Sequence, residues 1–293
     1  MLFQSFDGKE IFVNEWTDVK NPKGIVQIVH GMVEYGGRYE GFARFLNGHG
    51  FLVVADDHRG HGKTDEETLG FCKGDMFRDT VRDEGELTKH YKELYPDLKY
   101  FVLGFSYGSF LTQQYISEYG SLIDGAVIAG SNYKKDFEVY FGTLVAHLNG
   151  ATKRGYLIEK ASFGAYSKKF RDGEWLSVDE ENNAAYHADK YCTFTCTNRF
   201  YRDFFKGLRG LYTASYIAGL NKELPVLLAS GKDDPVGNMG KGVQKLYDFY
   251  TQKAGMKNVE IKLFENSRHE FLNEKVNREE KWGALLEFFE KHC

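Results

Sequence analysis

The chain of 293 residues is poor in cysteine and proline, with 4 of each, and it contains no long hydrophobic run. Its longest apolar stretches have the length of a strand, whereas a helix that spans a membrane needs about 20 apolar residues. The first residues, MLFQSFDGKEIFVNEW, lack the positively charged start and the apolar stretch of a signal peptide, so we expect none. We therefore expect a cytoplasmic protein whose cysteines stay free thiols in a reducing environment (Cys72, Cys192, Cys196 and Cys293).

Clustered metal ligands and a dominant charge are also lacking. Cys192 and Cys196 lie near His187, but no second pair of ligands accompanies them, so the sequence predicts no metal site. The chain has 38 Lys and Arg against 42 Asp and Glu, which gives a formal net charge of -4. The basic residues are dispersed rather than gathered into an arm, which argues against a nucleic-acid partner.

What remains is the composition of an ordinary globular protein. Hydrophobic residues make up 42% of the chain and charged residues 27%. The length suits one large domain, or one domain that carries an insertion. Aromatic residues are plentiful at 16%, which suits an aromatic pocket and a bulky core equally well.

Continuous apolar strands alternate with helical segments in two parts of the chain. We expect an opening hairpin that turns at Asp7-Gly8, followed by strands over 24–29, 51–55, 100–103, 126–129, 225–230 and 259–264. Helical patterns separate these strands, for example over 39–47, 79–95 and 241–253, and a last helix runs to the C-terminus. The alternation predicts an α/β fold with a mostly parallel central sheet covered by helices on both faces.

The alternation fails over about 131–220. This region is rich in aromatic residues, Lys and Arg, and it contains amphipathic pieces such as 138–148 and 197–208. We expect a helical cap (lid) inserted into a core formed by 1–130 and 221–293. A second independent domain is the alternative, but the low density of aliphatic residues in this region disfavours a separate core.

The strongest motif is Gly104-Phe105-Ser106-Tyr107-Gly108, between a predicted strand and a predicted helix. A G-x-S-x-G sequence in this setting is typical of a nucleophile elbow, which holds a serine on a sharp turn from strand to helix. Glycine on either side avoids a collision as the chain folds back. The backbone N–H of Tyr107 would point from the start of the helix toward a developing oxyanion. A chance match is the alternative, and the flanking strand and helix weaken it.

A serine nucleophile needs a base, and the base needs an orienting acid. In parallel-sheet hydrolases the acid and then the base follow the serine along the chain. Asp233 and Asp234 follow one predicted strand, and His269 follows the next. We favour Asp234 over Asp233, because the turn at Pro235-Val236 fixes its backbone. The other histidines after the serine do not follow a strand (His147, His187 and His292).

Another aspartate, Asp57, also ends a strand but precedes the serine, and we expect it to hydrogen-bond within its own loop.

Several motifs together resemble the α/β-hydrolase superfamily. They are HGMVEYGGRY at 30–39, DHRGHG at 57–62, the elbow at 104–108, Asp234-Pro235-Val236 and His269-Glu270. More narrowly, they resemble the monoacylglycerol lipase and lysophospholipase-like serine hydrolases, of the serine aminopeptidase S33 type. The resemblance implies that Ser106 is the nucleophile, Asp234 the acid and His269 the base, without a metal or an organic cofactor. It also implies an oxyanion hole formed by the N–H groups of Met32 and Tyr107.

In monoacylglycerol lipases the region that resembles 30–39 also touches the glycerol end of the substrate. The resemblance thus implies a substrate role for Glu34 and Arg38, and a structural ion pair between them is the alternative. Tyr35 stands where such lipases often carry histidine, and the cap matches them poorly. Both differences bear on the substrate rather than on the mechanism.

The sequence therefore predicts a serine hydrolase of carboxylic esters, with monoacylglycerol or lysophospholipid-type esters as the expected substrates. A short-chain carboxylesterase, a proline iminopeptidase-like amidase and a hydrolase-fold binding protein without catalysis are the alternatives. The expected partner is a small-molecule or lipid ester, with transient contact of the cap to a membrane surface as an open question. The sequence does not indicate an oligomeric state.

Overall fold

The computed structural model describes residues 1–134 and 137–293. Its strands form one eight-stranded sheet in the order β1-β2-β4-β3-β5-β6-β7-β8. The strands are β1 Leu2–Gln4, β2 Glu10–Trp16, β3 Gly24–Val29, β4 Phe51–Asp56, β5 Lys99–Phe105, β6 Gly125–Ala129, β7 Val226–Gly231 and β8 Val259–Phe264. β1 and β2 form the predicted hairpin and pair antiparallel, β2 also pairs antiparallel with β4, and all other neighbours pair parallel. The mostly parallel sheet predicted from the sequence is confirmed.

The central strands are apolar on both faces because helices cover both sides of the sheet. In β3 every residue is buried. Ile25 and Val29 belong to the core on one face, and Val26 and Ile28 to the core on the other. This alternation follows from the two-residue period of a strand.

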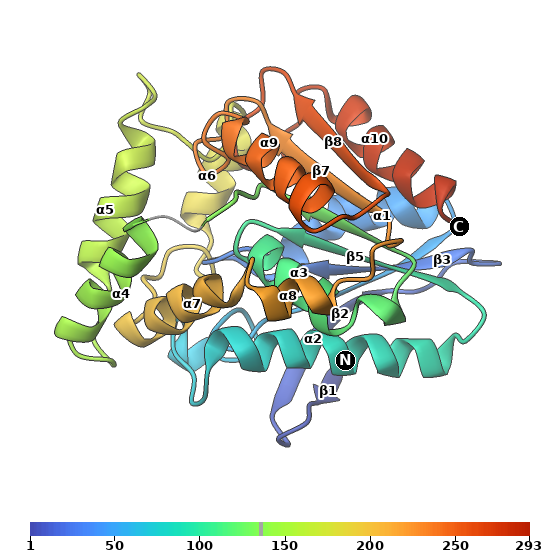
Figure 1. Cartoon of the computed structure of the whole chain (residues 1–293), viewed down its shortest axis with the longest axis horizontal. Coiled ribbons are helices and arrows are strands. Elements are labelled where there is room, and N and C mark those ends of the chain that lie inside the picture. The colour runs from blue at the N-terminus through green and yellow to red at the C-terminus, as the bar shows by residue number, and fades with distance from the viewer. Residues whose placement is uncertain (135–136) are drawn as a thin grey trace.

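Two sets of helices supply these cores (Figure 1). α1 (Glu40–Gly48) and α10 (Arg278–Lys291) cover one face, and α2 (Met76–Leu94), α3 (Tyr107–Glu118) and α9 (Lys241–Asp248) cover the other. A short π-helical segment, Phe249–Lys253, continues α9, so the single helix predicted over 241–253 changes its winding near its middle.

Between β6 and β7 the chain leaves the sheet. It forms α4 (Phe137–Leu148), α5 (Tyr156–Ser167), α6 (Glu180–Ala188), α7 (Asn198–Gly210) and α8 (Ala214–Gly219). α4 to α7 gather at the left of Figure 1, beyond one end of the strands. α4 and α7 correspond to the amphipathic segments that the sequence predicted over 138–148 and 197–208. Thr197 caps α7, since its hydroxyl accepts a hydrogen bond from the Phe200 N–H. α8 instead packs on α3, where the Ser117 hydroxyl donates to the Tyr216 carbonyl over 2.8 Å.

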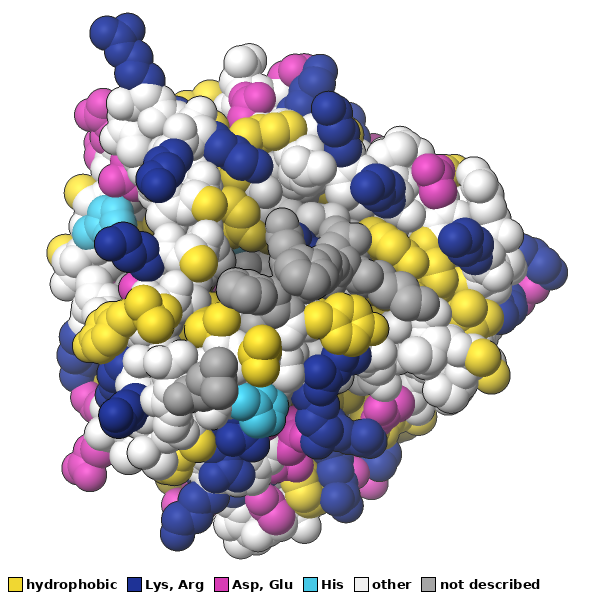
Figure 2. Space-filling model, turned by 60° about the vertical axis from the view of Figure 1, so that its left-hand side comes forward, with side chains coloured by type: hydrophobic (Ala, Val, Ile, Leu, Met, Phe, Trp, Pro, Cys, Tyr) yellow, Lys and Arg dark blue, Asp and Glu magenta, His cyan; other side chains and the backbone are white. Residues whose placement is uncertain are grey.

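Large apolar side chains are exposed on α4 and α5. Tyr140, Leu144, Tyr156 and Leu157 are each 56–64% exposed, and we call these four residues the cap patch. Figure 2 shows hydrophobic side chains on this face of the molecule, with Lys and Arg side chains around them. Among the described residues, no helix has the length and apolar character needed to cross a membrane.

Candidate active site

Ser106 lies in the turn between β5 and α3. Its backbone has φ 53° and ψ -118°, a conformation that costs a non-glycine residue about 1–3 kcal/mol and tends to persist only where the surroundings enforce it. The Ser106 N–H donates to the Ala129 carbonyl of the neighbouring strand over 3.0 Å, and its own carbonyl accepts from the Ser109 N–H over 2.9 Å. These bonds hold the serine at the carboxyl end of the sheet with its side chain half-buried.

The glycines of the elbow allow the backbone to approach its neighbours. A Cβ on Gly104 would collide with Thr112 and with the backbone of Gly108. A Cβ on Gly108 would collide with the carbonyl oxygens of Val29 and His30, at the end of β3. The first turn of α3 therefore sits directly against the segment that follows β3, as the sequence motif requires.

Three loops at the carboxyl ends of β5, β7 and β8 bring Ser106, Asp234 and His269 together. His269 Nε2 lies 2.8 Å from Ser106 Oγ, and His269 Nδ1 lies 3.0 Å from Asp234 Oδ1. The Asp234 carboxylate is held in turn, because it accepts from the Val236 N–H over 2.8 Å and from the Ser230 hydroxyl over 3.1 Å. The rival Asp233 is exposed. The arrangement suits transfer of the serine proton to an oriented imidazole.

The surroundings of His269 favour its protonated form. Burial alone would lower the pKa of this histidine, but the charge of Asp234 outweighs burial and raises the pKa above its usual value. Two aromatic rings pack against the imidazole, with centroids 4.9 Å away for Phe105 and 5.2 Å away for Trp175. Trp175 comes from the loop before α6, so a residue of the inserted region packs on the His269 ring.

The segment after β3 lies beside the serine. A Cβ on Gly31 would come within 3.1 Å of Ser106 Cβ. The Gly31 N–H donates to Glu34 Oε1 over 2.5 Å, so this amide is engaged. Within 1–134 and 137–293 the structure assigns no acceptor to the Met32 N–H, and Tyr107 is the first residue of α3, whose first N–H groups have no partner inside the helix.

Glu34 and Arg38, for which the resemblance implies a substrate role, form the ion pair weighed as the alternative. Arg38 Nη1 lies 2.7 Å from Glu34 Oε2, and both side chains are almost fully buried. Arg38 also bonds Glu270 through both of its terminal nitrogens, at 2.5 and 2.9 Å. Burial raises the pKa of Glu34, whereas at Glu270 the charge of Arg38 outweighs burial and lowers the pKa. Through these contacts Arg38 links the segment after β3 to Glu270, the residue that follows His269.

Sequence reasoning gave no role to Glu270, Asn182 or Trp175. Glu270 adjoins His269 in the sequence, which indicates that it lies near the site but not that it binds Arg38. Asn182 donates to Glu270 Oε2 over 2.6 Å from α6, and no spacing in the sequence indicates that contact. Asp57 hydrogen-bonds within its own loop as predicted, since it accepts from the Lys63 N–H, and it also accepts from the Gly36 N–H in the segment after β3.

One group of side chains among the described residues has the types and spacing of metal ligands. Asp56, His58 and Glu84 each offer one atom, and these atoms lie within 4.8 Å of one another. Cys192 and Cys196 are buried free thiols outside this group.

Comparison with known proteins gives a consistent family. A family model described as "Serine aminopeptidase, S33" matches residues 20–276. The monoglyceride lipase of Homo sapiens is 37% identical over 102 residues, which cover 35% of this chain and 33% of that protein. The chain thus matches about a third of the length of this curated relative.

Solved structures extend the likeness to the whole chain. A thermostable carboxyl esterase from Bacillus coagulans, solved with glycerol, is 28% identical with a TM-score of 0.90, over 100% of this chain and 97% of that one. A soluble variant of monoglyceride lipase from Saccharomyces cerevisiae shares the fold, with 18% identity and a TM-score of 0.80 over 100% of this chain and 95% of that one. This chain belongs to the serine aminopeptidase S33 family and has the α/β-hydrolase fold.

Proposed function

We propose that the protein is a carboxylester hydrolase that works through an acyl-enzyme, with Ser106 as nucleophile, His269 as base and Asp234 as orienting acid. The observation that carries the proposal is the continuous line from Ser106 Oγ to His269 Nε2 at 2.8 Å and from His269 Nδ1 to Asp234 at 3.0 Å. The names of the relatives, monoglyceride lipase and carboxyl esterase, support the same reaction class.

In this mechanism His269 takes the Ser106 proton as the oxygen attacks the ester carbonyl. The N–H groups of Met32 and Tyr107 stabilise the oxyanion of the tetrahedral intermediate, and His269 then protonates the leaving alcohol. Water attacks the acyl-enzyme with His269 again as base, which releases the acid and restores the serine. Asp234 keeps the imidazole oriented and stabilises its charge in both halves.

For the substrate we propose an ester with an apolar acyl chain, such as a monoacylglycerol or a lysophospholipid. Trp175 over the base, together with Phe163 and Tyr166 beside it, supports an apolar acyl site. The likeness to the Bacillus coagulans carboxyl esterase makes short-chain esters the second candidate. Glu34 and Arg38 would act mainly by fixing the loop, since their charges already satisfy each other.

We propose further that 131–220 is a cap over the core of 1–130 and 221–293, and that the cap patch touches lipid aggregates transiently. Exposed tyrosine and leucine side chains that share a face of the molecule with Lys and Arg side chains suit an anionic lipid–water interface. The four unpaired thiols support a reducing compartment such as the cytoplasm.

The test is a hydrolysis profile over nitrophenyl esters from acetate to palmitate, with monoacylglycerol and lysophosphatidylcholine, on the wild type and Ser106→Ala. We expect activity to peak at medium or long chains and to vanish in the variant, and a fluorophosphonate probe to label only the wild type. Full activity of Ser106→Ala would refute the mechanism. Activity confined to acetate and butyrate would select the short-chain esterase, cleavage of aminoacyl-naphthylamides in preference to esters would select an amidase, and no labelling at all would select a binding protein.

A further inference from the structure

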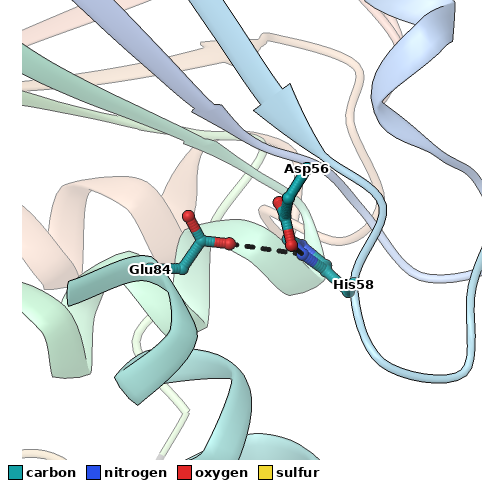
Figure 3. A group of neighbouring side chains, drawn as sticks. All are labelled: Asp56, His58 and Glu84. Atoms are coloured by element: carbon teal, nitrogen blue, oxygen red, sulfur yellow. Dashed lines mark hydrogen bonds and ion pairs between the residues drawn. The ribbon is translucent and has the colours of Figure 1, made fainter. Parts of the chain in front are cut away.

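A buried cluster of charged side chains contacts His30, in the segment that lies beside Ser106. Asp56 ends β4, His58 follows it in the loop, and Glu84 projects from α2, so three elements converge (Figure 3). Each of the three residues is at most 2% exposed. His58 Nδ1 lies 2.9 Å from Asp56 Oδ2 and 3.3 Å from Glu84 Oε1. We call these three residues the acid–histidine cluster.

On its other side, His58 hydrogen-bonds to His30 and stacks on its ring. His58 Nε2–H donates to the His30 carbonyl over 3.1 Å, and the His58 backbone N–H donates to His30 Nε2 over 2.9 Å. The two rings also stack, with centroids 3.6 Å apart. Because His30 Nε2 accepts a hydrogen bond, His30 is neutral and its proton sits on Nδ1, where it donates to the Gly31 carbonyl over 2.7 Å.

The segment that contains His30 lies beside Ser106 and the start of α3. The His30 carbonyl is one of the two backbone groups that leave no room for a side chain on Gly108, at the start of α3. Gly31 approaches Ser106, and the next amide along the chain is that of Met32. The segment is therefore held between α3 on one side and His58 on the other, and both contacts meet at the same carbonyl.

The charges of the cluster balance if one proton is shared between its carboxyl groups. His58 Nε2 faces a carbonyl, which only accepts, and Nδ1 faces two carboxyl groups, so both ring nitrogens carry protons. Burial works against that charge, but the carboxyl groups outweigh burial and raise the pKa of His58 well above its usual value. Burial first, and then the charge of Asp56, raise the pKa of Glu84 to about 8. Asp56 Oδ1 and Glu84 Oε1 are buried without a donor, and a proton on Glu84 would serve both.

We propose that the acid–histidine cluster is a positioning device for the oxyanion hole: it fixes the His58 ring, which holds the His30 carbonyl and thereby sets the Met32 N–H relative to Ser106. This inference rests on the proposed function, because it gives a role to residues behind that site. His58 touches no reacting atom and acts through His30. The same three side chains could instead hold a divalent cation, and the experiment below separates the two.

The central variant is His58→Asn, whose shorter side chain cannot bridge the carboxyl groups and the His30 carbonyl. We expect kcat to fall about 10- to 100-fold with KM nearly unchanged, since outright loss of one oxyanion-hole donor costs roughly 10²- to 10³-fold. Glu84→Gln mimics the protonated carboxyl group, so it should retain about tenfold more activity than His58→Asn. Asp56→Asn removes the charge that balances His58 and should resemble His58→Asn.

The matched control is Asp83→Asn. Asp83 is the neighbour of Glu84 on α2 and pairs with buried Arg59 over 2.6 Å, in the same loop as His58. Loss of this ion pair should lower Tm, as loss of the cluster does, but should leave kcat unchanged because neither residue contacts His30. Equal losses of kcat at matched Tm in His58→Asn and Asp83→Asn would reduce the cluster to general stability and overturn the inference.

A pH profile gives a second readout. Glu84 ionises above about pH 8, which leaves the cluster with a net negative charge beside the His30 carbonyl. We expect kcat of the wild type to fall there and Glu84→Gln to lose that alkaline limb. The titratable and charged groups around the cluster are His30 after β3, Asp57, Arg59 and His61 in the loop, Asp83 on α2, Tyr100 on β5, and Tyr107 and Tyr115 on α3.

Metal analysis and labelling complete the test. We expect no stoichiometric zinc or other divalent metal in the purified protein and no effect of a chelator on kcat. A bound metal that His58→Asn releases, or wild-type kcat within threefold in His58→Asn, would overturn the inference. Fluorophosphonate labelling of Ser106 would still proceed, at a reduced rate, in His58→Asn. If Ser106→Ala stays active, the proposed function fails instead.

Discussion

Replacing Asp234 by asparagine tests the charge of the acid separately from its geometry. Asp234 Oδ1 accepts from the Val236 N–H over 2.8 Å and faces His269 Nδ1 at 3.0 Å, whereas Oδ2 accepts from the Ser230 hydroxyl. An asparagine can keep this arrangement, with its oxygen toward Val236 and His269 and its NH₂ group toward Ser230, whose hydroxyl can also accept. The imidazole then keeps the correct tautomer, and the variant loses little except the charge.

The distance sets the size of the effect. Two unit charges 3.0 Å apart interact by about 5.5 kcal/mol at an effective dielectric constant near 20, and this is an upper bound for the lost stabilisation of the imidazolium. The amide dipole retains part of that energy, so we expect a loss of about 4 kcal/mol, or roughly 10³-fold in kcat. Without the carboxylate, burial dominates at His269 and its pKa drops, so the acid limb of kcat/KM moves to lower pH.

The assay is the pH dependence of hydrolysis of a soluble nitrophenyl ester between pH 5 and 9, with Asp233→Asn as the matched control. Asp233 is exposed and one position away, so its variant should behave as the wild type. The reasoning is refuted if Asp234→Asn stays within tenfold of the wild type, if its acid limb moves to higher pH, or if Asp233→Asn shows the same loss. A loss far above 10⁴-fold would mean that the asparagine flips and inverts the tautomer.

Two further predictions concern the elbow and the cap. Gly108→Ala forces a Cβ into the carbonyl oxygens of Val29 and His30, so urea unfolding should show a loss of at least about 2 kcal/mol in the free energy of unfolding. The control Gly283→Ala, in an open position of α10, should be neutral or slightly stabilising. Equal effects of the two substitutions would contradict the close approach at Gly108. The double variant Leu144→Ser and Leu157→Ser should weaken binding to anionic lipid vesicles roughly tenfold in sedimentation assays, and unchanged binding would remove the cap patch from the lipid contact.

The sheet and the catalytic candidates were predictable because parallel strands carry their signal locally. The run over 24–29 is apolar at almost every position, since both faces of β3 are covered, and a short run of this kind between turn signals is typical of a buried strand. Ser106, Asp234 and His269 could be found because each lies in the turn or loop that follows a strand, and the carboxyl ends of parallel strands meet at one edge of the sheet. Their approach in space follows from the topology alone.

The contacts that link loops to the inserted region could not be predicted in this way. Arg38 meets Glu270 across most of the chain, and Trp175 reaches His269 from a loop without regular periodicity. The acid–histidine cluster was hidden for a different reason. Asp56 and Glu84 look like surface residues of a loop and a helix, and they are buried together because α2 places Glu84 beside His58 in the loop that follows β4.

The site consists of two halves with different attachments. The serine and the segment after β3 form one unit, since the backbone of Gly108 rests on the carbonyls of Val29 and His30. His269, the proposed base, belongs to the other half. The loop over 172–179 is bonded to the residues beside it: Asp172 pairs with Arg268 at 2.8 Å and the Leu176 carbonyl accepts from the Glu270 N–H over 2.7 Å.

Arg38 joins the halves, because it bonds Glu34 in the first and Glu270 in the second. A shift of the loop over 172–179 would therefore act on His269 and on the Arg38 link before it reached Ser106. Ser106 and the N–H groups of the proposed oxyanion hole are positioned by the sheet, and the inserted region contacts His269, the proposed base. Changes in that region should consequently alter proton transfer and substrate fit more than the strained geometry of the serine.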